Sequence, residues 1–118
     1  MTGKPLVSVI MPAYQAEKYI KKAIESVWIQ DVPLELIVVD DCSRDNTRDV
    51  LKRYIMRSDF HYIKNKDNMG AAASRNSGVE AAKGDFIAYL DSDDWWEPGK
   101  LKKQLEMMKQ TGSVICST

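Results

Sequence analysis

The sequence predicts an α/β fold, a doubly wound and mostly parallel sheet with helices on both of its faces. Short runs rich in β-branched residues alternate with segments of helical periodicity, and this alternation is typical of βαβ units. Unusual polar clusters follow three of the apolar runs, where strands of such a sheet would end. With 118 residues, 44% of them hydrophobic and 29% charged, the chain is expected to form one globular domain.

The first half of the chain is expected to form a strand, a helix, a second strand and a second helix. Apolar residues at 6–11 predict the first strand, which we expect to stop at Pro12 because proline donates no backbone hydrogen bond. The first helix is predicted by apolar residues at three- and four-residue spacing: Ile20, Ala23, Ile24 and Val27. Residues 34–39 predict the second strand, and Asp45 or Thr47 is expected to cap the second helix.

The second half continues the same alternation. Residues 60–63 predict a third strand, and an alanine-rich segment at 70–82 predicts a helix, in which Gly70 and Gly78 are expected to allow a close backbone approach. The apolar run 86–90 predicts a buried strand, after which Pro98 opens a helix. The apolar face of that helix contains Leu101, Leu105 and Met108. Residues 113–116 predict one more short strand, whose unpaired edge would allow a homodimer.

Charge and composition exclude several classes of protein. The formal net charge of zero argues against nucleic acid as a partner, because binding to phosphate backbones uses clustered Lys and Arg. Cys42 and Cys116 are too few for a disulfide framework or a zinc site, and they fit a reducing cytoplasm. The apolar runs have the length of strands and the N-terminus lacks a secretion-signal pattern. We therefore expect a cytoplasmic protein without a transmembrane segment, either free or peripherally bound at the inner face of the membrane.

The most informative motif is DSDD at residues 91–94, directly after the expected buried strand. Its three carboxylates repel one another and would take up protons unless a positive charge held them ionised. Hard divalent cations prefer such oxygen ligands. We interpret the motif as a Mn²⁺ or Mg²⁺ site that holds a phosphorylated substrate. The alternative is a capped, solvated acidic turn.

The expected topology brings the polar clusters together, because parallel strands point their carboxyl ends to one edge of the sheet. The clusters are Pro12, Ala13 and Tyr14 after the first strand, Asp40 and Asp41 after the second, and residues 91–94 after the fourth. If the strand order reverses between the first and fourth strands, a crevice opens there.

Four motifs in this order resemble a family 2 glycosyltransferase of the GT-A fold over nearly the whole chain. They are VSVIMPAY at 7–14, VDDCS at 39–43, ASRNSG at 73–78 and DSDD at 91–94. The resemblance implies metal-dependent transfer of a sugar, with inversion, from a nucleoside-diphosphate donor, usually UDP-linked, to a hydroxyl of a sugar, lipid or polysaccharide. It also implies that residues 1–118 are the nucleotide-sugar-binding part of a truncated domain. In this family the acceptor-binding segment and the general base come after the point where this chain stops.

The resemblance assigns roles around the acidic motif. Asp93 is the first choice of metal ligand, and Asp91 shares the metal or contacts the ribose. Ser92 and Asp94 belong to the nucleotide-sugar site, with Asp94 facing the donor sugar or ordering the loop. Arg75 contacts the diphosphate, which matches its guanidinium, or pairs with the aspartates in the empty protein.

The same resemblance assigns the first two strand ends to the nucleoside. Asp40 would accept a hydrogen bond from the ring N–H of uracil, which favours UDP as the donor nucleotide. Asp41 reaches the ribose or satisfies backbone groups of its turn. Tyr14 lays its ring against the base while Pro12 and Ala13 shape the pocket floor, although ordinary core packing of Tyr14 has equal weight.

Two positions depart from the family pattern, and three aromatic or titratable residues stay open. Gln15 stands where asparagine is common and Cys42 where glycine is common, which is acceptable if the backbone at Cys42 avoids positive φ. Of Trp95 and Trp96, we expect one in the core and one exposed. His61 is expected away from the site and without function.

Two other classes remain as alternatives. The first is a non-catalytic nucleotide-sugar-binding module, or an inactive fragment, that keeps the donor site and lacks the acceptor half. The second is a receiver-type phosphoacceptor domain, which would need a lysine near the last strand, where residues 113–116 offer none. A dinucleotide-binding Rossmann domain is weaker, because no GxGxxG motif follows the first strand.

Overall fold

The structure, a computed structural model, describes residues 5–111 and confirms the predicted α/β class. Four strands form one parallel sheet in the order β3-β2-β1-β4. The strands are β1 (Val7–Ala13), β2 (Leu34–Asp40), β3 (Phe60–Lys64) and β4 (Phe86–Tyr89). The helices are α1 (Ile20–Trp28), α2 (Thr47–Leu51), the short 3₁₀ helix η1 (Lys52–Tyr54), α3 (Ala71–Ala81) and α4 (Lys100–Thr111). The strand predicted at 113–116 lies outside the described residues.

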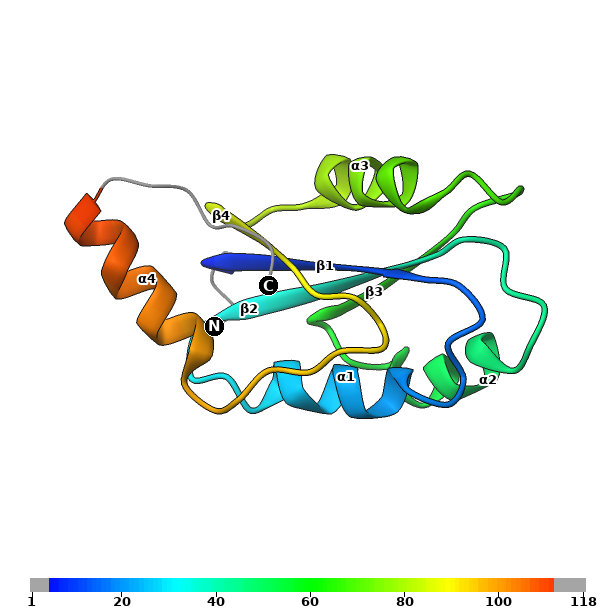
Figure 1. The fold of residues 1–118 in the computed structure, drawn as a ribbon, viewed down its shortest axis with the longest axis horizontal. Helices are drawn as coiled ribbons and strands as arrows, with labels where there is room; N and C mark the ends of the chain where they lie inside the picture. The colour runs from blue at the N-terminus through cyan, green and yellow to red at the C-terminus, as the bar shows by residue number, and fades with distance from the viewer. Residues whose placement is uncertain (1–4, 112–118) are drawn as a thin grey trace.

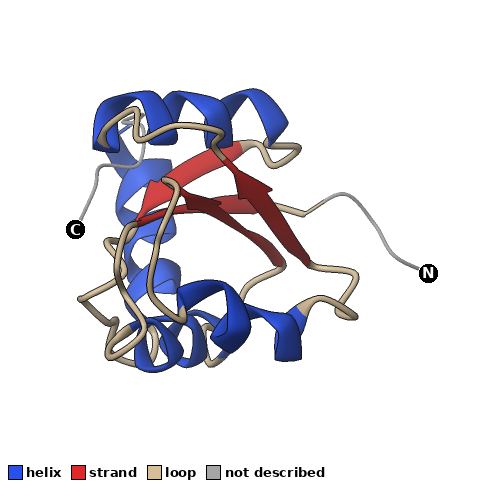
Figure 2. Cartoon of the chain, turned by 90° about the vertical axis from the view of Figure 1, so that its right-hand side faces the viewer, coloured by secondary structure: helices blue, strands red, loops and turns tan. Residues whose placement is uncertain are grey.

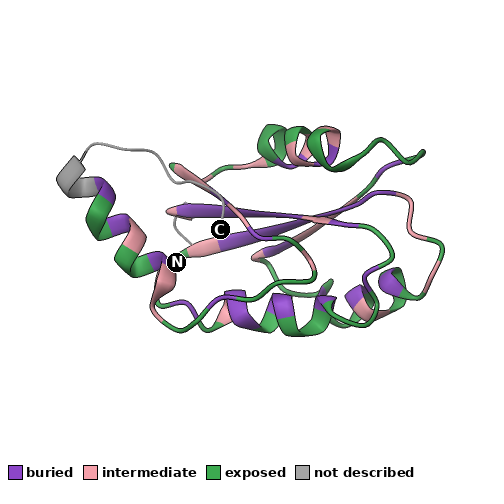
Figure 3. Ribbon diagram, in the orientation of Figure 1, coloured by how far each residue is buried: buried purple, intermediate pink, exposed green. Residues whose placement is uncertain are grey.

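Helices cover both faces of the sheet (Figure 1), with α3 on one face and α1 and α2 on the other. Viewed toward the carboxyl edge, the sheet lies between these layers (Figure 2). Alternation along β1 divides its side chains, so that Val9 joins the large core with α1 while Ile10 joins a small cluster on the α3 side. β1 and β2 are mostly buried, β3 and β4 are mostly of intermediate burial, and α3 is mostly exposed (Figure 3).

Pro12 lies inside β1 and does not end it, which corrects the sequence-based boundary. Ile10 O accepts a hydrogen bond from Leu90 N, so the even-numbered positions of β1 point their backbone groups toward β4. Strand pairing with β4 ends at Ile10 and Tyr89. The missing N–H of Pro12 therefore falls where no ladder partner exists, and the strand continues along β2 without losing a hydrogen bond.

α3 lies against the sheet through small residues. Its buried members are Ser74 and Gly78, and a Cβ added at Gly78 would lie 2.5 Å from Ile10 Cγ2. This confirms the expectation that Gly78 permits a close backbone approach. For Gly70 the same expectation is wrong, because a Cβ there would meet nothing within 4 Å. Gly70 instead has a φ of +92°, a conformation that side chains disfavour, at the entry to α3.

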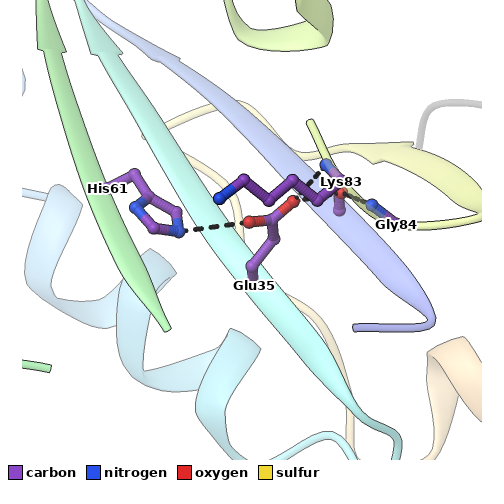
Figure 4. A network of polar contacts seen from close by, with 5 residues as sticks. Glu35, His61, Lys83 and Gly84 are labelled. Carbon is purple, nitrogen blue, oxygen red and sulfur yellow. Dashed lines mark hydrogen bonds and ion pairs between the residues drawn. The ribbon is translucent and has the colours of Figure 1, made fainter. Parts of the chain in front are cut away.

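A polar network on the α3 side ties β4 to the middle of the sheet (Figure 4). The buried Glu35 on β2 accepts hydrogen bonds from Ser8 Oγ at 2.6 Å and from the backbone N–H of Lys83 at 2.7 Å. Its other oxygen lies 3.1 Å from His61 Nε2. Gly84 N donates to Ser8 Oγ, which completes the connection between the segment before β4 and β1. His61 thus has a structural partner away from the carboxyl edge.

Candidate functional site

The strand order reverses at β1, as the sequence-based crevice requires. β2 lies on one side of β1 and β4 on the other. A cavity of about 400 Å³ lies there. Its lining residues come from the end of β1, the start of α1, α3 and the loop after β4: Pro12, Tyr14, Gln15, Ala16, Tyr19, Ala71, Arg75, Asp91, Ser92 and Asp93.

Tyr14 belongs to the cavity and not to the core. Its side chain is 48% exposed, which favours the binding interpretation over core packing. Tyr19 adds a second exposed aromatic ring to the same cavity and was not predicted from the sequence. Pro12 lines the cavity, whereas Ala13 is buried behind it and forms part of the core. The cavity therefore offers aromatic faces against which a planar base or a sugar ring can pack.

Arg75 and Asp91 form an ion pair in the lining of the cavity. Arg75 Nη2 lies 3.2 Å from Asp91 Oδ1, and both side chains are partly exposed, at 37% and 57%. Arg75 projects from α3, one residue after the buried Ser74 that packs on the sheet. In this structure the guanidinium is paired with the acidic motif, as expected for the empty protein. It lies within reach of an anionic ligand in the cavity.

The acidic motif forms a turn that separates two cavities. Asp94 N donates to Asp91 O at 3.0 Å, and Asp94 Oδ1 accepts from Trp95 N at 2.9 Å. Asp91, Ser92 and Asp93 line the first cavity, whereas Asp94 lines a neighbouring one. Asp94 therefore orders the loop, one of its two expected roles.

The donor set is suited to a metal that a substrate helps to hold. Within residues 5–111, no group of three or more His, Cys, Asp and Glu side chains is placed to hold a metal ion. Mg²⁺ and similar ions commonly bind through one or two carboxylates together with substrate phosphates. Asp91 and Asp93 in one cavity provide such a pair.

Asp40 is buried and does not present a free carboxylate at the edge. It is 1% exposed, and its two oxygens accept hydrogen bonds from Ser43 N at 3.0 Å and Tyr62 Oη at 2.8 Å. Burial and this hydrogen bond to Asp40 raise the pKa of Tyr62. A base contact by Asp40 would require this buried carboxylate to become accessible, and it stays a prediction.

Asp41 holds the loop that leads into α3, the structural one of its two expected roles. It accepts hydrogen bonds from Asn65 Nδ2, Met69 N and Gly70 N, at 2.9, 2.7 and 2.9 Å. Burial alone would raise the pKa of Asp41, but the hydrogen bonds from Met69, Asn65 and Gly70 outweigh it and lower the pKa. Asn65 directly follows β3, so a polar residue after the third strand was the signal that the sequence analysis missed.

The loops after β1 and β2 are bound to each other through Gln15. Its N–H donates to Ser43 Oγ at 3.0 Å, and its side-chain oxygen accepts from Arg44 N and Asp45 N. Gln15 and Cys42 both have positive φ, at 52° and 62°. The condition under which Cys42 was acceptable, a backbone without positive φ, is therefore not met. The two loops are nevertheless connected, and the loop after β1 lines the cavity.

The tryptophans after the acidic motif divide as expected. Trp96 is 2% exposed and packs in the core, whereas Trp95 is 49% exposed. Lys22 Nζ of α1 lies 3.6 Å from the ring centroid of Trp95, a cation–π contact. Trp96 N donates to Ser26 Oγ at 3.1 Å, which fixes the loop against α1.

Comparison with protein families gives a match over most of the chain. The model described as "Glycosyl transferase family 2" matches residues 8–118. The putative teichuronic acid biosynthesis glycosyltransferase TuaG of Bacillus subtilis is 49% identical over 98% of this chain and 46% of its own length. The UDP-Glc:alpha-D-GlcNAc-diphosphoundecaprenol beta-1,3-glucosyltransferase WfgD of Escherichia coli is 45% identical over 87% of this chain and 41% of its own length. The chain thus spans less than half the length of these relatives.

Solved structures give the same result. S. aureus TarS 1-349 in complex with UDP-GlcNAc matches with a TM-score of 0.83 and 33% identity, over 92% of this chain and 32% of that chain. The mannosyltransferase PcManGT of Pyrobaculum calidifontis, in complex with GDP-Man and Mn²⁺, matches with a TM-score of 0.72 and 28% identity, over 80% and 29%. Among the described residues, no helix is both long and apolar enough to span a bilayer.

Proposed function

The chain belongs to glycosyl transferase family 2, and from this premise we propose that residues 1–118 form the nucleotide-sugar-binding part of a metal-dependent glycosyltransferase. The observation that carries the proposal is the cavity at the strand-order reversal, where Tyr14, Arg75, Asp91 and Asp93 come together. A nucleoside diphosphate needs an aromatic surface for its base, a cation for its phosphates and ligands for a bridging metal. These residues supply all three.

In the proposed complex, Tyr14 packs against the base above Pro12, and the buried Ala13 supports this wall. Arg75 leaves Asp91 and binds the diphosphate, for which its planar guanidinium is well suited. Ala71, the first residue of α3, also lines the cavity. The positive end of the helix dipole therefore favours negative charge at the same wall.

Asp93 and Asp91 would hold a divalent cation together with the substrate phosphates, and such an ion stabilises the negative charge of a nucleoside-diphosphate leaving group. Mn²⁺ in the PcManGT complex supports this assignment, as does the oxygen-rich donor set. Ser92 lies between the two aspartates in the cavity lining. Asp94 shapes the loop that presents the acidic pair.

UDP is the proposed donor nucleotide. TarS binds UDP and UDP-GlcNAc, and WfgD is named for a UDP-glucose donor. Asp41 contributes by holding Met69 and Gly70 in front of α3, and Asp40 by bracing Ser43 and Tyr62. Base selection by Asp40 would require its buried carboxylate to become accessible.

The proposed reaction is sugar transfer with inversion to a hydroxyl of a sugar, lipid or polysaccharide. WfgD is named for a GlcNAc-diphosphoundecaprenol acceptor, and a lipid-linked acceptor of that kind would bring the protein to the inner face of the membrane. Inversion requires a general base that takes the proton of the acceptor hydroxyl as the new bond forms. We assign that base to no residue between 5 and 111.

The test is a calorimetric titration of UDP with Mn²⁺, with EDTA and with ADP in place of UDP. We expect UDP binding that depends on the metal, that exceeds ADP binding, and that is lost in Asp93→Ala. The matched control is Asp31→Ala, a change at an exposed aspartate outside the cavity lining. Failure of every nucleotide to bind would refute the proposal. UDP binding by a protein that transfers no sugar would favour the non-catalytic module.

A further inference from the structure

A buried side-chain amide connects the loop after β2 to helix α3. Asn65 directly follows β3, is 7% exposed, and donates its backbone N–H to Asp40 O at 2.9 Å. Its side-chain nitrogen Nδ2 donates to Asp41 Oδ1 at 2.9 Å and to Ser74 Oγ at 3.0 Å. Asn65 is not part of the cavity lining, but Ser74 is followed on α3 by Arg75, which is. The amide therefore lies directly behind the wall of the proposed donor site.

The chemistry of a primary amide suits this connection. The nitrogen of such an amide carries two N–H groups, so Asn65 can serve two acceptors at once. Asp41 is 5% exposed and Ser74 is fully buried, so these acceptors have little access to water. The bond to the Asp41 carboxylate is charge-assisted and therefore strong. A carboxylate in place of the Asn65 amide would offer no donor when ionised and would repel Asp41.

These bonds matter for α3 because that helix has little apolar packing. In α3, which the structure describes in full, only Ser74 and Gly78 are buried. Neither apolar cluster of the described residues includes a member of α3. Few large side chains therefore interlock the helix with the sheet. Polar contacts hold it instead, from Asn65 to Ser74 and from Gly70 N to Asp41 Oδ2 at 2.9 Å.

The position of α3 determines where its cavity-lining residues lie. Ala71 and Arg75 are four residues apart, so they share one face of the helix, and both line the cavity. Ser74 lies beside that face and is buried. A displacement of the helix at Ser74 would therefore move the Arg75 guanidinium and the amino end of α3 together. Both are proposed to bind the donor diphosphate.

We propose that Asn65 is a positioning residue for the donor diphosphate, which it does not touch. By bonding Asp41 and Ser74 through one amide nitrogen, it holds α3 where Arg75 can reach the phosphates. The inference rests on the proposed function, because Arg75 is the proposed ligand of the diphosphate. Asn65 contributes to binding of the phosphates, whereas the base packs on Tyr14, which belongs to the loop after β1.

The test compares UDP with uridine, which has the same base and ribose but no phosphate. UDP is titrated by calorimetry with Mn²⁺, and uridine by NMR, into the original protein and into Ser74→Ala. We expect Ser74→Ala to bind UDP about tenfold more weakly, the effect of about one hydrogen bond to a charged group. Its affinity for uridine should stay within about twofold. Equal losses for UDP and uridine would indicate general disorder of the site and would overturn the inference.

Ser74→Ala is the decisive variant because it keeps the bond between Asn65 and Asp41 and places a strong helix former in α3, so it should fold. Asn65→Ala removes both bonds and should weaken UDP binding at least as much. The matched control is Ser77→Ala, the same change on the same helix, where the hydroxyl donates to Ala73 O at 3.1 Å within α3. It should bind UDP as the original protein does.

A double-mutant cycle shows whether the effect passes through the guanidinium. If Ser74 acts by placing Arg75, Ser74→Ala should change UDP affinity by less than about twofold in an Arg75→Ala background. A merely structural role for the hydrogen bond would give the same tenfold loss in both backgrounds, and that result would overturn the inference.

The same titrations distinguish a failure of this inference from a failure of the proposed function. UDP binding that needs Arg75 but is unchanged in Ser74→Ala and Asn65→Ala would overturn the inference and leave the donor site standing. Absence of UDP binding by the original protein would overturn the proposed function and this inference with it. The first failure appears only in the variants, and the second appears before any variant is made.

Discussion

The ion pair between Arg75 and Asp91 competes with the proposed ligand for the same guanidinium. The two side chains lie 3.2 Å apart and are 37% and 57% exposed. Pairs as exposed as this contribute about 0–1 kcal/mol, because water screens the charges and ordering the side chains costs entropy. Replacing Asp91 by Asn removes the competitor. In EDTA, Asp91→Asn should therefore bind UDP more tightly, by up to about fivefold, since 1.4 kcal/mol corresponds to tenfold.

With Mn²⁺ the sign of the effect should reverse. Asp91 is then a proposed metal ligand, and its loss should weaken UDP binding by about tenfold or more. Even the loss of a residue that is only hydrogen-bonded to a metal ligand commonly lowers metal affinity by about tenfold. One substitution thus raises affinity without metal and lowers it with metal. A purely structural role for Asp91 would change both affinities in the same direction.

Calorimetry at low ionic strength measures both affinities in one series. The gain in EDTA should shrink at high salt, because salt screens an exposed pair. Asp31→Asn serves as the matched control, since it makes the same chemical change at an exposed aspartate outside the cavity lining. Weaker binding of Asp91→Asn in EDTA would refute the reasoning. Unchanged binding in Mn²⁺ would refute the metal assignment of Asp91.

Three further predictions concern stability. Gly78→Ala should lower the free energy of unfolding by about 1–2 kcal/mol in urea titrations, because a 2.5 Å contact between the new Cβ and Ile10 Cγ2 outweighs the helix propensity that alanine gains. Ile10→Leu removes that methyl group and should reduce the loss of stability caused by Gly78→Ala. Equal losses in the original and Ile10→Leu backgrounds would contradict the clash. Glu35→Leu should cost about 2–4 kcal/mol by leaving Ser8 Oγ and Lys83 N without their acceptor, whereas an unchanged melting temperature would show that water replaces it. Because the pKa of Asp41 is lowered in the folded protein, its contribution to stability is complete above the unfolded-state pKa near 3.9 and is lost as the pH falls through the folded-state pKa. The Asp41→Asn protein should therefore lose less stability than the original protein on acidification below about pH 5. The same dependence of unfolding free energy on pH in both proteins would contradict this prediction.

The fold could be predicted because buried parallel strands appear as continuous apolar runs, and because the helices between them keep their own periodicity. The boundary at Pro12 could not, since it depends on which side of β1 the missing N–H faces and on where β4 stops pairing. Neither fact is local to the proline. The close approach of α3 was anticipated from Gly78, but the conformation required at Gly70 was not.

The candidate site also contains features that the sequence predicted and features that it could not predict. The sequence placed carboxylates at the strand ends, and the structure brings Tyr14, Arg75 and Asp91 into one cavity. What the sequence could not show is which carboxylates stay available. The buried carboxylate of Asp40 accepts a hydrogen bond from Tyr62. Tyr62 reaches it because of the register in which β2 pairs with the adjacent strand β3. Whether a carboxylate stays accessible depends on the residues that surround it in the fold. The sequence next to the aspartate does not indicate which residues these are.

The pairing of β1 with β4 has a consequence for the order of events as the chain is made and folds. β1 can pair with β2 early, but its pairing with β4 joins Val7 to Phe86, segments far apart in sequence. Such contacts close large loops and form late. The opposite walls of the donor cavity, at 12–19 and 91–93, meet only when β4 docks. A chain still emerging from the ribosome lacks this cavity until that step, so the proposed nucleotide binding would report the docking of β4.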